Sequence, residues 1–154
     1  MEVKLIASDM DGTLLNDERL ISKENKKSIR RAVDSGIIFT IATGRMFKSI
    51  VPFAEELELD IPLIAYNGAL VQDAVTKEVL YDAPVELETA LAILDYCRER
   101  NYYIQAYVND TLLVHEASDF AKMYAEFAGV EFVEMGKDLF AIKRAPHKLL
   151  IMTG

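Results

Sequence analysis

Residues 3–17 read VKLIASDMDGTLLND, an apolar run that leads into three acidic residues around a glycine. The run VKLIA has the length and composition of a strand that is buried on both faces. Alternate residues of an extended chain point the same way, so Asp9 and Asp11 can reach one site while Met10 turns away. Two carboxylates held that close require a cation or a shared proton. The stretch therefore predicts a core strand with a charged site at its end.

Two further apolar runs finish in polar or glycine-bearing residues, GIIFTIATG at 36–44 and IPLIAYNG at 61–68. Between the runs, helical spacing predicts one helix from an N-cap at Ser22 to about Ser35. It predicts another over 46–59, which Pro52 either kinks or begins. Strands that alternate with helices over short connections form a parallel sheet with right-handed crossovers. The predicted fold class is α/β with a Rossmann-like parallel sheet, whose ligands bind outside the carboxyl ends of the strands.

The pattern changes after residue 68. Residues 69–84 alternate around a turn and predict a hairpin that closes at Pro84. Beyond it we expect an α+β arrangement with a domain boundary near Pro84, which divides the chain into 1–84 and 85–154. Its expected elements are a helix over 86–100, a hairpin of YIQAYV and TLLVH around Asn-Asp, a helix over about 117–128, and strands at VEFVE and KLLIMTG.

The composition argues against several functional classes. A chain of 154 residues that is 51% hydrophobic can bury a core. The net charge of −8 is spread evenly, because residues 1–84 and 85–154 each net −4, so we expect no basic stripe and no nucleic-acid partner. The single cysteine, Cys97, suits a reducing compartment. No run approaches a membrane span or a signal peptide, so we expect a cytoplasmic protein with no membrane partner.

A turn is the simplest interpretation of Asp-x-Asp-Gly taken alone, because Asp and Gly are common turn residues. A calcium-binding EF-hand loop does not fit, since Leu14 and Leu20 stand where it needs Gly and Glu. Asp17 and Glu18 are expected to be solvated loop residues.

The longer string DMDGTLL, directly after a strand, resembles motif I of the haloacid dehalogenase-like (HAD) superfamily. IATGR at 41–45 looks like its motif II. IPLIAYNGA at 61–69 is similar to the third-strand segment of the Cof-type branch, in which an α+β cap follows that strand. The resemblance covers the whole chain. It implies an incomplete HAD core over 1–84 and part of a cap domain over 85–154.

The resemblance also implies an activity, namely Mg²⁺-dependent hydrolysis of phosphomonoesters such as sugar phosphates or other small phosphorylated metabolites. Asp9 would attack phosphorus to form an aspartyl-phosphate, and Asp11 would protonate the leaving alcohol and then deprotonate water. Both would be metal ligands, Asp9 through its carboxylate and Asp11 through its backbone carbonyl. Contacts to the substrate phosphate are expected from Met10, Gly12, Thr43, Gly44, Arg45 and Asn67.

Some of these residues have simpler interpretations. Arg45 either pairs with the phosphate through its guanidinium or only begins a surface helix. Asn67-Gly68 is a common turn dipeptide, and Thr43-Gly44 at a strand end is usually a cap and a turn. These residues are candidates because they accompany motif I.

Two motifs of the family are missing from the sequence. Nothing after Thr43 reads GDxxND, and Lys148 stands in an expected cap strand, so it is not assigned to motif III. We therefore expect the N-terminal part of a longer protein, with little or no activity by itself. Three alternatives stay open: a receiver-like signalling module, although Asn67 stands where its phosphoacceptor would be, a catalytically silent regulatory or binding module, and a phosphomutase of the same family.

Overall fold

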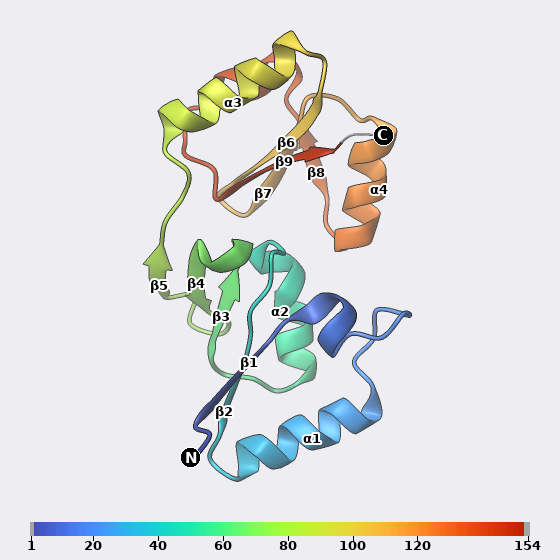
Figure 1. Cartoon of the computed structure of the whole chain (residues 1–154), viewed down its shortest axis with the longest axis vertical. Coiled ribbons are helices and arrows are strands. Elements are labelled where there is room, and N and C mark those ends of the chain that lie inside the picture. Colours follow the sequence, from blue (N-terminus) through green and yellow to red (C-terminus); the bar gives the residue numbers. More distant parts are fainter. Residues whose placement is uncertain (1, 153–154) are drawn as a thin grey trace. The chain divides into compact units, whose positions relative to one another are not determined.

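The computed structural model describes residues 2–152. The chain divides into two units, one ending at Asp82 and the other beginning at Ala83 (Figure 1). The boundary expected from the sequence lies near Pro84. Each unit has its own sheet and helices, so each is described separately.

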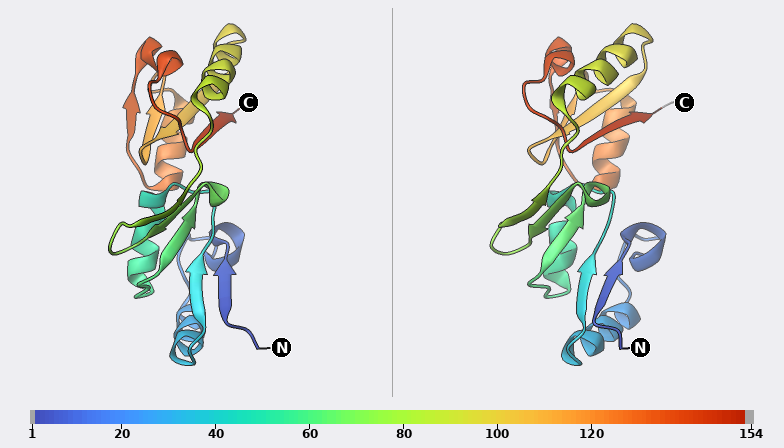
Figure 2. Two further views of the ribbon diagram at one scale, coloured as in Figure 1. Left: turned by 90° about the vertical axis from the view of Figure 1, so that its left-hand side faces the viewer. Right: turned by 60° about the vertical axis from the view of Figure 1, so that its left-hand side comes forward.

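The first unit is built on a parallel arrangement of strands. β1 (Leu5–Ser8) pairs in parallel with β2 (Ile38–Ile41). β2 continues into a parallel bridge between Ala42 and Ile64, and Ile64 belongs to β3 (Pro62–Ala65). Figure 2 shows β1, β2 and β3 running in the same direction. The parallel sheet predicted from the three apolar runs is confirmed.

Helix α1 (Lys23–Asp34) connects β1 to β2. Its N-cap is Ser22, whose hydroxyl accepts a hydrogen bond from the backbone N–H of Asn25 at 3.0 Å. The helix stops before Gly36, which has a φ of +86° that a residue with a side chain rarely adopts. The predicted start and end of this helix are confirmed.

Helix α2 (Phe47–Glu56) connects β2 to β3 and contains Pro52 in its interior, so the helix does not begin at the proline. Two ion pairs join α1 to the end of α2 and the residues after it. Lys26 pairs with Glu56, and Nη1 of Arg30 lies 2.5 Å from Oε2 of Glu58. Both helices therefore lie on the same face of the sheet, as successive right-handed crossovers in one direction require.

An antiparallel hairpin completes the first unit. β4 (Leu70–Asp73) pairs with β3 and with β5 (Val79–Asp82), as the alternation in the sequence predicts. At the turn, Oδ1 of Asp73 accepts hydrogen bonds from the backbone N–H groups of Val75 at 2.9 Å and Thr76 at 2.7 Å. These two donors lower the pKa of Asp73 below its ordinary value, because they stabilise the carboxylate.

The first strand is not buried, contrary to the prediction. Leu5 is 54% exposed and Ile6 is 36% exposed, although they point to opposite faces. Ile38, which is paired with Leu5, is 52% exposed. Within residues 2–152, β2 is the one strand beside β1, and the two helices cover one face. An apolar strand in that position remains exposed to solvent along one edge and on one face.

The second unit contains a four-stranded sheet in the order β8-β7-β6-β9, in which β7 and β8 are parallel and the other pairs antiparallel. The predicted turn between β6 and β7 is present, with positive φ at both Asn109 and Asp110. The last two residues of the expected strand KLLIMTG lie outside the described residues. The elements in chain order are α3 (Leu87–Glu99), β6 (Tyr103–Val108), β7 (Thr111–Val114), α4 (Asp119–Ala128), β8 (Phe132–Glu134), the 3₁₀ segment Gly136–Ala141 and β9 (Lys148–Met152).

Helices cover both faces of β6. Ile104, Ala106 and Val108 pack with α3 and the 3₁₀ segment in one hydrophobic cluster. The alternate residues face α4, and the Tyr103 and Phe120 ring centroids are 5.3 Å apart. Burial raises the pKa of Tyr103 to about 12. Between two tyrosines of this face lies a fully buried glutamine, Gln105, which accepts from the Tyr103 hydroxyl at 2.8 Å.

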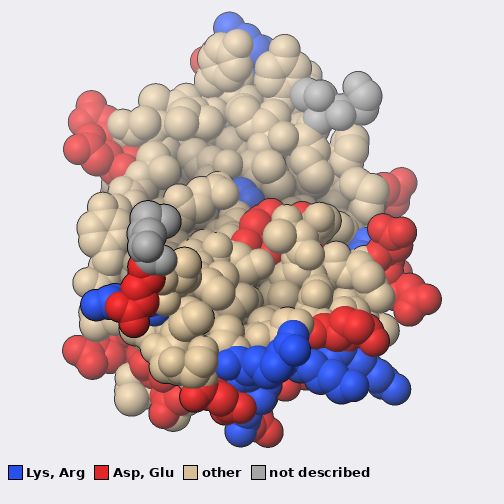
Figure 3. All heavy atoms as spheres, turned by 60° about the horizontal axis from the view of Figure 1, so that its bottom comes forward, with Lys and Arg blue, Asp and Glu red and all other residues tan. Residues whose placement is uncertain are grey.

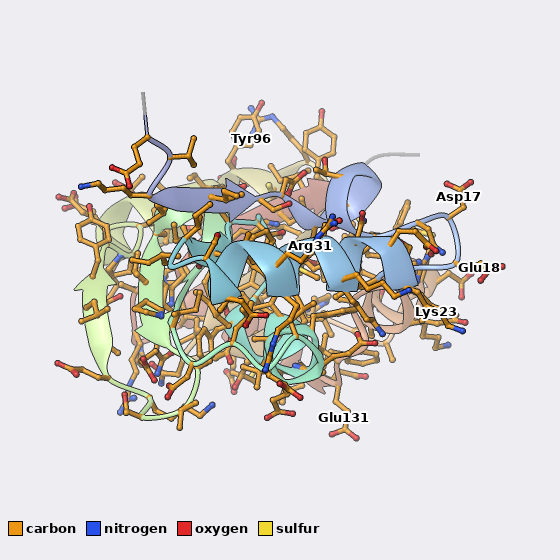
Figure 4. The ribbon with its side chains drawn as sticks, turned by 90° about the horizontal axis from the view of Figure 1, so that it is seen from below. Asp17, Glu18, Lys23, Arg31, Tyr96 and Glu131 are labelled. Carbon is orange, nitrogen blue, oxygen red and sulfur yellow. The ribbon has the colours of Figure 1, made fainter. Side chains whose placement is uncertain are left out.

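The charges are less even in space than along the sequence. Figure 3 shows a group of Lys and Arg side chains along the lower edge of the face in view, with Asp and Glu side chains next to them. Helix α1 carries five Lys and Arg residues, and Lys23, Lys27 and Arg31 follow one another at i, i+4 spacing. Lys26 and Arg30 of the same helix are paired with Glu56 and Glu58. Figure 4 shows Asp17 and Glu18 on the loop that precedes α1, pointing outward as expected.

No described helix is both long enough and apolar enough to cross a membrane.

Candidate active site

The ends of the three parallel strands bring four predicted site residues together. Asp9 follows β1, Thr43 and Gly44 follow β2, and Asn67 follows β3. All four line one open hollow of about 470 Å³ in the first unit. Parallel strands present their carboxyl ends at the same edge of a sheet, which is where ligands of such sheets bind. The sequence thus located this hollow through the strand ends.

The two aspartates are separated by a buried residue. β1 ends at Ser8, so Asp9 and Asp11 lie just beyond the strand and not on it. Asp9 keeps an extended backbone, with φ −67° and ψ 160°, and the chain then makes a wide turn over Met10–Leu14, in which Asp11 and Gly12 have non-helical dihedral angles. Met10 is completely buried whereas both aspartates are exposed, which agrees with the expected alternation. A phosphate contact from Met10 therefore has to come from its backbone.

Gly12 makes the sharp bend in this turn. Its φ is +73°, a conformation that glycine adopts readily and other residues rarely adopt. The turn closes with a hydrogen bond of 2.9 Å from the backbone N–H of Leu15 to the carbonyl oxygen of Met10. The exposed residues Asp11 and Gly12 are thus held on a fixed backbone next to Asp9.

Arg45 is bound to Asp11. Its Nη2 lies 2.6 Å from Oδ1 of Asp11, and its Nε lies 2.9 Å from Oδ2. Arg45 is 6% exposed, while the Asp11 side chain is 42% exposed. The Arg45 guanidinium carbon also lies 5.8 Å from the centroid of the Phe53 ring. This bidentate pairing assigns the guanidinium to a carboxylate, whereas the sequence suggested a phosphate. A surface helix-start position, the simpler interpretation, is wrong because the residue is buried.

The loops after β2 and β3 are joined by their backbones. The N–H of Thr43 donates to the carbonyl of Ile64 at 2.9 Å, and the N–H of Asn67 donates to the carbonyl of Thr43 at 3.0 Å. The Thr43 hydroxyl accepts from the N–H of Arg45 at 3.3 Å. Thr43 is 6% exposed, so its hydroxyl is fixed at the edge of the hollow.

Gly44 has no room for a side chain. A Cβ atom at this position would lie 2.7 Å from Oδ1 of Asn67, closer than real Cβ contacts. The close approach depends on a strained loop, because Tyr66, Asn67 and Gly68 have φ values of +52°, +58° and +95°. Two successive non-glycine residues with positive φ cost free energy, and such strain is concentrated at functional sites. Sequence reasoning placed Gly44 and Asn67 in the site but did not detect that they contact each other.

Comparisons with known proteins agree with this geometry. Residues 6–153 match the family model described as haloacid dehalogenase-like hydrolase. The chain belongs to this family. The resemblance drawn from motifs I and II is confirmed, and the receiver-like alternative is not supported. The α/β fold is likewise that of the family, with a mixed architecture and a partial parallel core.

Relatives within the family carry phosphatase names. The chain is 41% identical over 124 residues to 5-amino-6-(5-phospho-D-ribitylamino)uracil phosphatase YwtE of Bacillus subtilis, a match covering 80% of this chain and 42% of that protein. It is 33% identical over 113 residues to pyridoxal phosphate phosphatase YbhA of Escherichia coli, covering 73% and 42%. The crystal structure of a haloacid dehalogenase-like hydrolase from Bacteroides thetaiotaomicron has a TM-score of 0.86 at 28% identity, covering 99% of this chain and 59% of that one. The chain thus spans 42% of the length of both curated relatives.

The residues near the strand ends offer oxygen donors of the kind that Mg²⁺ prefers. Mg²⁺ is usually bound by one or two carboxylates and keeps several waters, so it does not need a cluster of protein ligands. Among residues 2–152 there is no group of three or more His, Cys, Asp or Glu side chains that could hold a metal. The exposed carboxylate of Asp9 and the backbone carbonyl of Asp11 are suitable donors. The Asp11 carboxylate is bound to Arg45 through both oxygens.

Proposed function

We propose that the first unit carries the nucleophile half of a Mg²⁺-dependent phosphomonoester hydrolase. The observation that carries this proposal is the convergence of Asp9, Thr43, Gly44 and Asn67 on one hollow at the carboxyl ends of three parallel strands. Membership of the haloacid dehalogenase-like hydrolase family supports it. The names of the curated relatives suggest a substrate in which a phosphate ester is attached to a small metabolite, as in a phosphoribitylaminouracil or pyridoxal phosphate.

In the first step, a carboxylate oxygen of Asp9 attacks phosphorus and the ester P–O bond breaks. The leaving alkoxide takes a proton from the carboxyl group of Asp11. In the second step, water attacks the phosphorus of the aspartyl-phosphate, Asp11 takes a proton from that water, and the bond between phosphorus and Asp9 breaks. Asp9 is then a carboxylate again, and the products are the alcohol and inorganic phosphate.

The surrounding residues position and neutralise the phosphoryl group. The Thr43 hydroxyl and the backbone N–H of Gly44 would donate to its oxygens, and the Asn67 amide, which lies against Gly44, would bind beside them. Asp9 and the carbonyl of Asp11 would hold Mg²⁺, which offsets the negative charge of the attacking carboxylate and the phosphate.

In this scheme Arg45 pairs with Asp11, the residue that donates and accepts the proton. A guanidinium has only donors, so it pairs with the carboxylate form of Asp11, the form that accepts a proton in the second step. For the first step, the Asp11 carboxyl group has to turn away from Arg45. The Asp11 side chain is 42% exposed, so it has room to do so.

The experiment is to treat the 154-residue chain with Mg²⁺ and either p-nitrophenyl phosphate or radiolabelled acetyl phosphate. We expect slow or undetectable turnover, together with acid-labile label on Asp9 that EDTA prevents. Asp9→Asn abolishes the label. Asp11→Asn retains it, because the acetate released from acetyl phosphate needs no proton donor, while hydrolysis of the aspartyl-phosphate still needs a base. Asp17→Asn is the matched control, since Asp17 is an outward-pointing loop residue (Figure 4).

Label that persists in Asp9→Asn would contradict the proposal. A chain that takes no label, with or without Mg²⁺, would favour the catalytically silent binding module. Transfer of the label to a second phosphorylated sugar, in place of water, would indicate a phosphomutase.

A further inference from the structure

The second unit contains a cavity of its own, which we call the aromatic cavity. Its volume is about 370 Å³, within the range of small-molecule sites. It lies where α3 ends, β6 begins and α4 begins. The lining residues used below are Arg98, Tyr103, His115, Glu116, Phe120 and Phe140.

Two pairs of rings form its walls. The centroids of Tyr103 and Phe120 are 5.3 Å apart, and those of His115 and Phe140 are 5.2 Å apart. Both separations are typical of favourable aromatic pairs. The rings come from four different segments of the chain, so the unit has to be folded for the walls to exist.

Two of these rings are fixed by hydrogen bonds. The Tyr103 hydroxyl donates to Oε1 of the buried Gln105 at 2.8 Å. Nδ1 of His115 lies 2.8 Å from the carbonyl oxygen of Gly136. A carbonyl only accepts, so Nδ1 carries a proton and the imidazole ring is held in one orientation. A ligand ring therefore meets walls that are already ordered, which lowers the entropy cost of binding.

One cation lies among the rings. The guanidinium carbon of Arg98 is 5.7 Å from the Phe140 ring centroid. Its Nη2 is 3.0 Å from Oδ1 of Asp95, in an exposed pair three residues apart on α3. Such exposed pairs contribute little, and a guanidinium has five N–H donors, so Arg98 can bind an additional anion. Glu116 is the acidic residue of the lining, and its carboxylate repels a bound anion.

We propose that the aromatic cavity binds a small planar aromatic anion, a carboxylate or a phosphate, with its ring between the aromatic walls and its charged group on Arg98. The site lies wholly in the second unit. It does not depend on Asp9, on Mg²⁺ or on the proposed hydrolysis.

The test uses two fluorescent probes, anthranilate and anthranilamide, which share a ring and differ in charge. The chain contains no tryptophan, so probe emission can be followed without that background. We expect the full chain to bind anthranilate about tenfold more tightly than anthranilamide, because the carboxylate of anthranilate accepts hydrogen bonds from the charged Arg98 guanidinium. Arg98→Gln removes that difference and leaves anthranilamide binding unchanged. Glu116→Gln tightens anthranilate binding about twofold, because it removes a like charge.

A wall variant tests the ring contribution. Phe120→Leu should weaken both probes by about three- to tenfold, because the aromatic contact is lost while an apolar side chain is kept. Arg100→Gln and Tyr96→Leu are matched controls. They alter another cation and ring pair, with the Arg100 guanidinium carbon 3.8 Å from the Tyr96 centroid, outside the cavity lining.

Three results would overturn the proposal: no saturable anthranilate binding, equal affinity for the two probes, or equal losses in Arg98→Gln and Arg100→Gln. Arg98 is an exposed side chain, so its variant keeps the test decisive even if Phe120→Leu fails to fold. The same titration on Asp9→Asn, which should bind normally, separates this site from the proposed active site.

Discussion

Strand β1 of the first unit and strand β6 of the second unit are both apolar and flanked by helices, yet they differ in burial. Ile6 in β1 is 36% exposed and Ile104 in β6 is 2% exposed. β6 lies between β7 and β9 and has helices on both faces, whereas β1 has β2 beside it and helices on one face. An apolar run thus predicts a strand, while the neighbours of that strand determine how far it is buried.

The largest expected effect is in the core of the second unit. Ile104→Ala should lower the free energy of unfolding of that unit by about 2–5 kcal/mol, because it leaves a cavity among packed side chains. Ile6→Ala, the same change in β1, should cost less than about 1.5 kcal/mol, since water already reaches the side chain. Urea unfolding followed by NMR signals from each unit measures both. Equal losses would show that β1 is shielded from water in solution.

The second effect is a difference in the free energy of unfolding that is lost when one or the other partner of the Asp11–Arg45 ion pair is removed. Asp11→Ala should cost about 1–3 kcal/mol, because the buried Arg45 guanidinium loses its charged partner. Arg45→Met should cost less, since the exposed Asp11 carboxylate can be hydrated instead. Unfolding free energies of the two variants give the comparison. A larger loss for Arg45→Met would mean that the packing of Arg45 on Phe53 outweighs its charge.

The third effect is a coupling between two loops of the candidate active site. Gly44→Ala should destabilise the first unit by about 1–3 kcal/mol, because the new Cβ overlaps with Oδ1 of Asn67. In an Asn67→Ala background the same substitution should cost less by about 1 kcal/mol or more, a coupling typical of residues in contact. A double-mutant cycle measures this difference. Additive effects would mean that the two side chains do not meet.

The smallest effect is a difference in pH dependence. Tyr103 in the second unit has its pKa raised to about 12. Its contribution to the free energy of unfolding is therefore complete below its unfolded pKa near 10, and it is lost as the pH rises toward 12. Asp73 in the first unit has a pKa lowered from its ordinary value of 3.8. Its contribution to the free energy of unfolding is therefore present above pH 3.8 and is lost as the pH falls below that value. Tyr103→Phe should weaken the alkaline dependence of stability, and Asp73→Asn should weaken the acid dependence. Stability curves that these substitutions do not change would contradict the assignment.

Local signals in the sequence predicted most of the fold. The N-cap at Ser22, the stop at Gly36 and the turn at Asn109 and Asp110 depend on residues close in the chain, and all three are confirmed. The exposure of β1 was not predicted, because it depends on which segments lie beside the strand. The 3₁₀ segment Gly136–Ala141 was also missed, since its packing against α3 involves residues distant in sequence.

In the candidate active site, the positions that follow from strand order were predictable, whereas the contacts between side chains were not. Asp9, Thr43 and Asn67 follow parallel strands, so topology alone brings them to one edge. The partner of Arg45 could not be predicted, because a long side chain reaches in several directions and only the folded structure selects Asp11. The contact between Gly44 and Asn67 likewise depends on the left-handed loop after β3, for which the sequence offers one signal, the Asn-Gly dipeptide.

The aromatic face of β6 has a spectroscopic consequence. The chain has seven tyrosines and no tryptophan. Tyr66 and Tyr81 belong to the first unit, and the other five belong to the second, where Tyr103 and Tyr107 pack against Phe120 and Tyr124 of α4. Near-ultraviolet circular dichroism and tyrosine emission of this protein therefore report mainly on the second unit. Unfolding of the first unit is better followed through its backbone signal in the far ultraviolet.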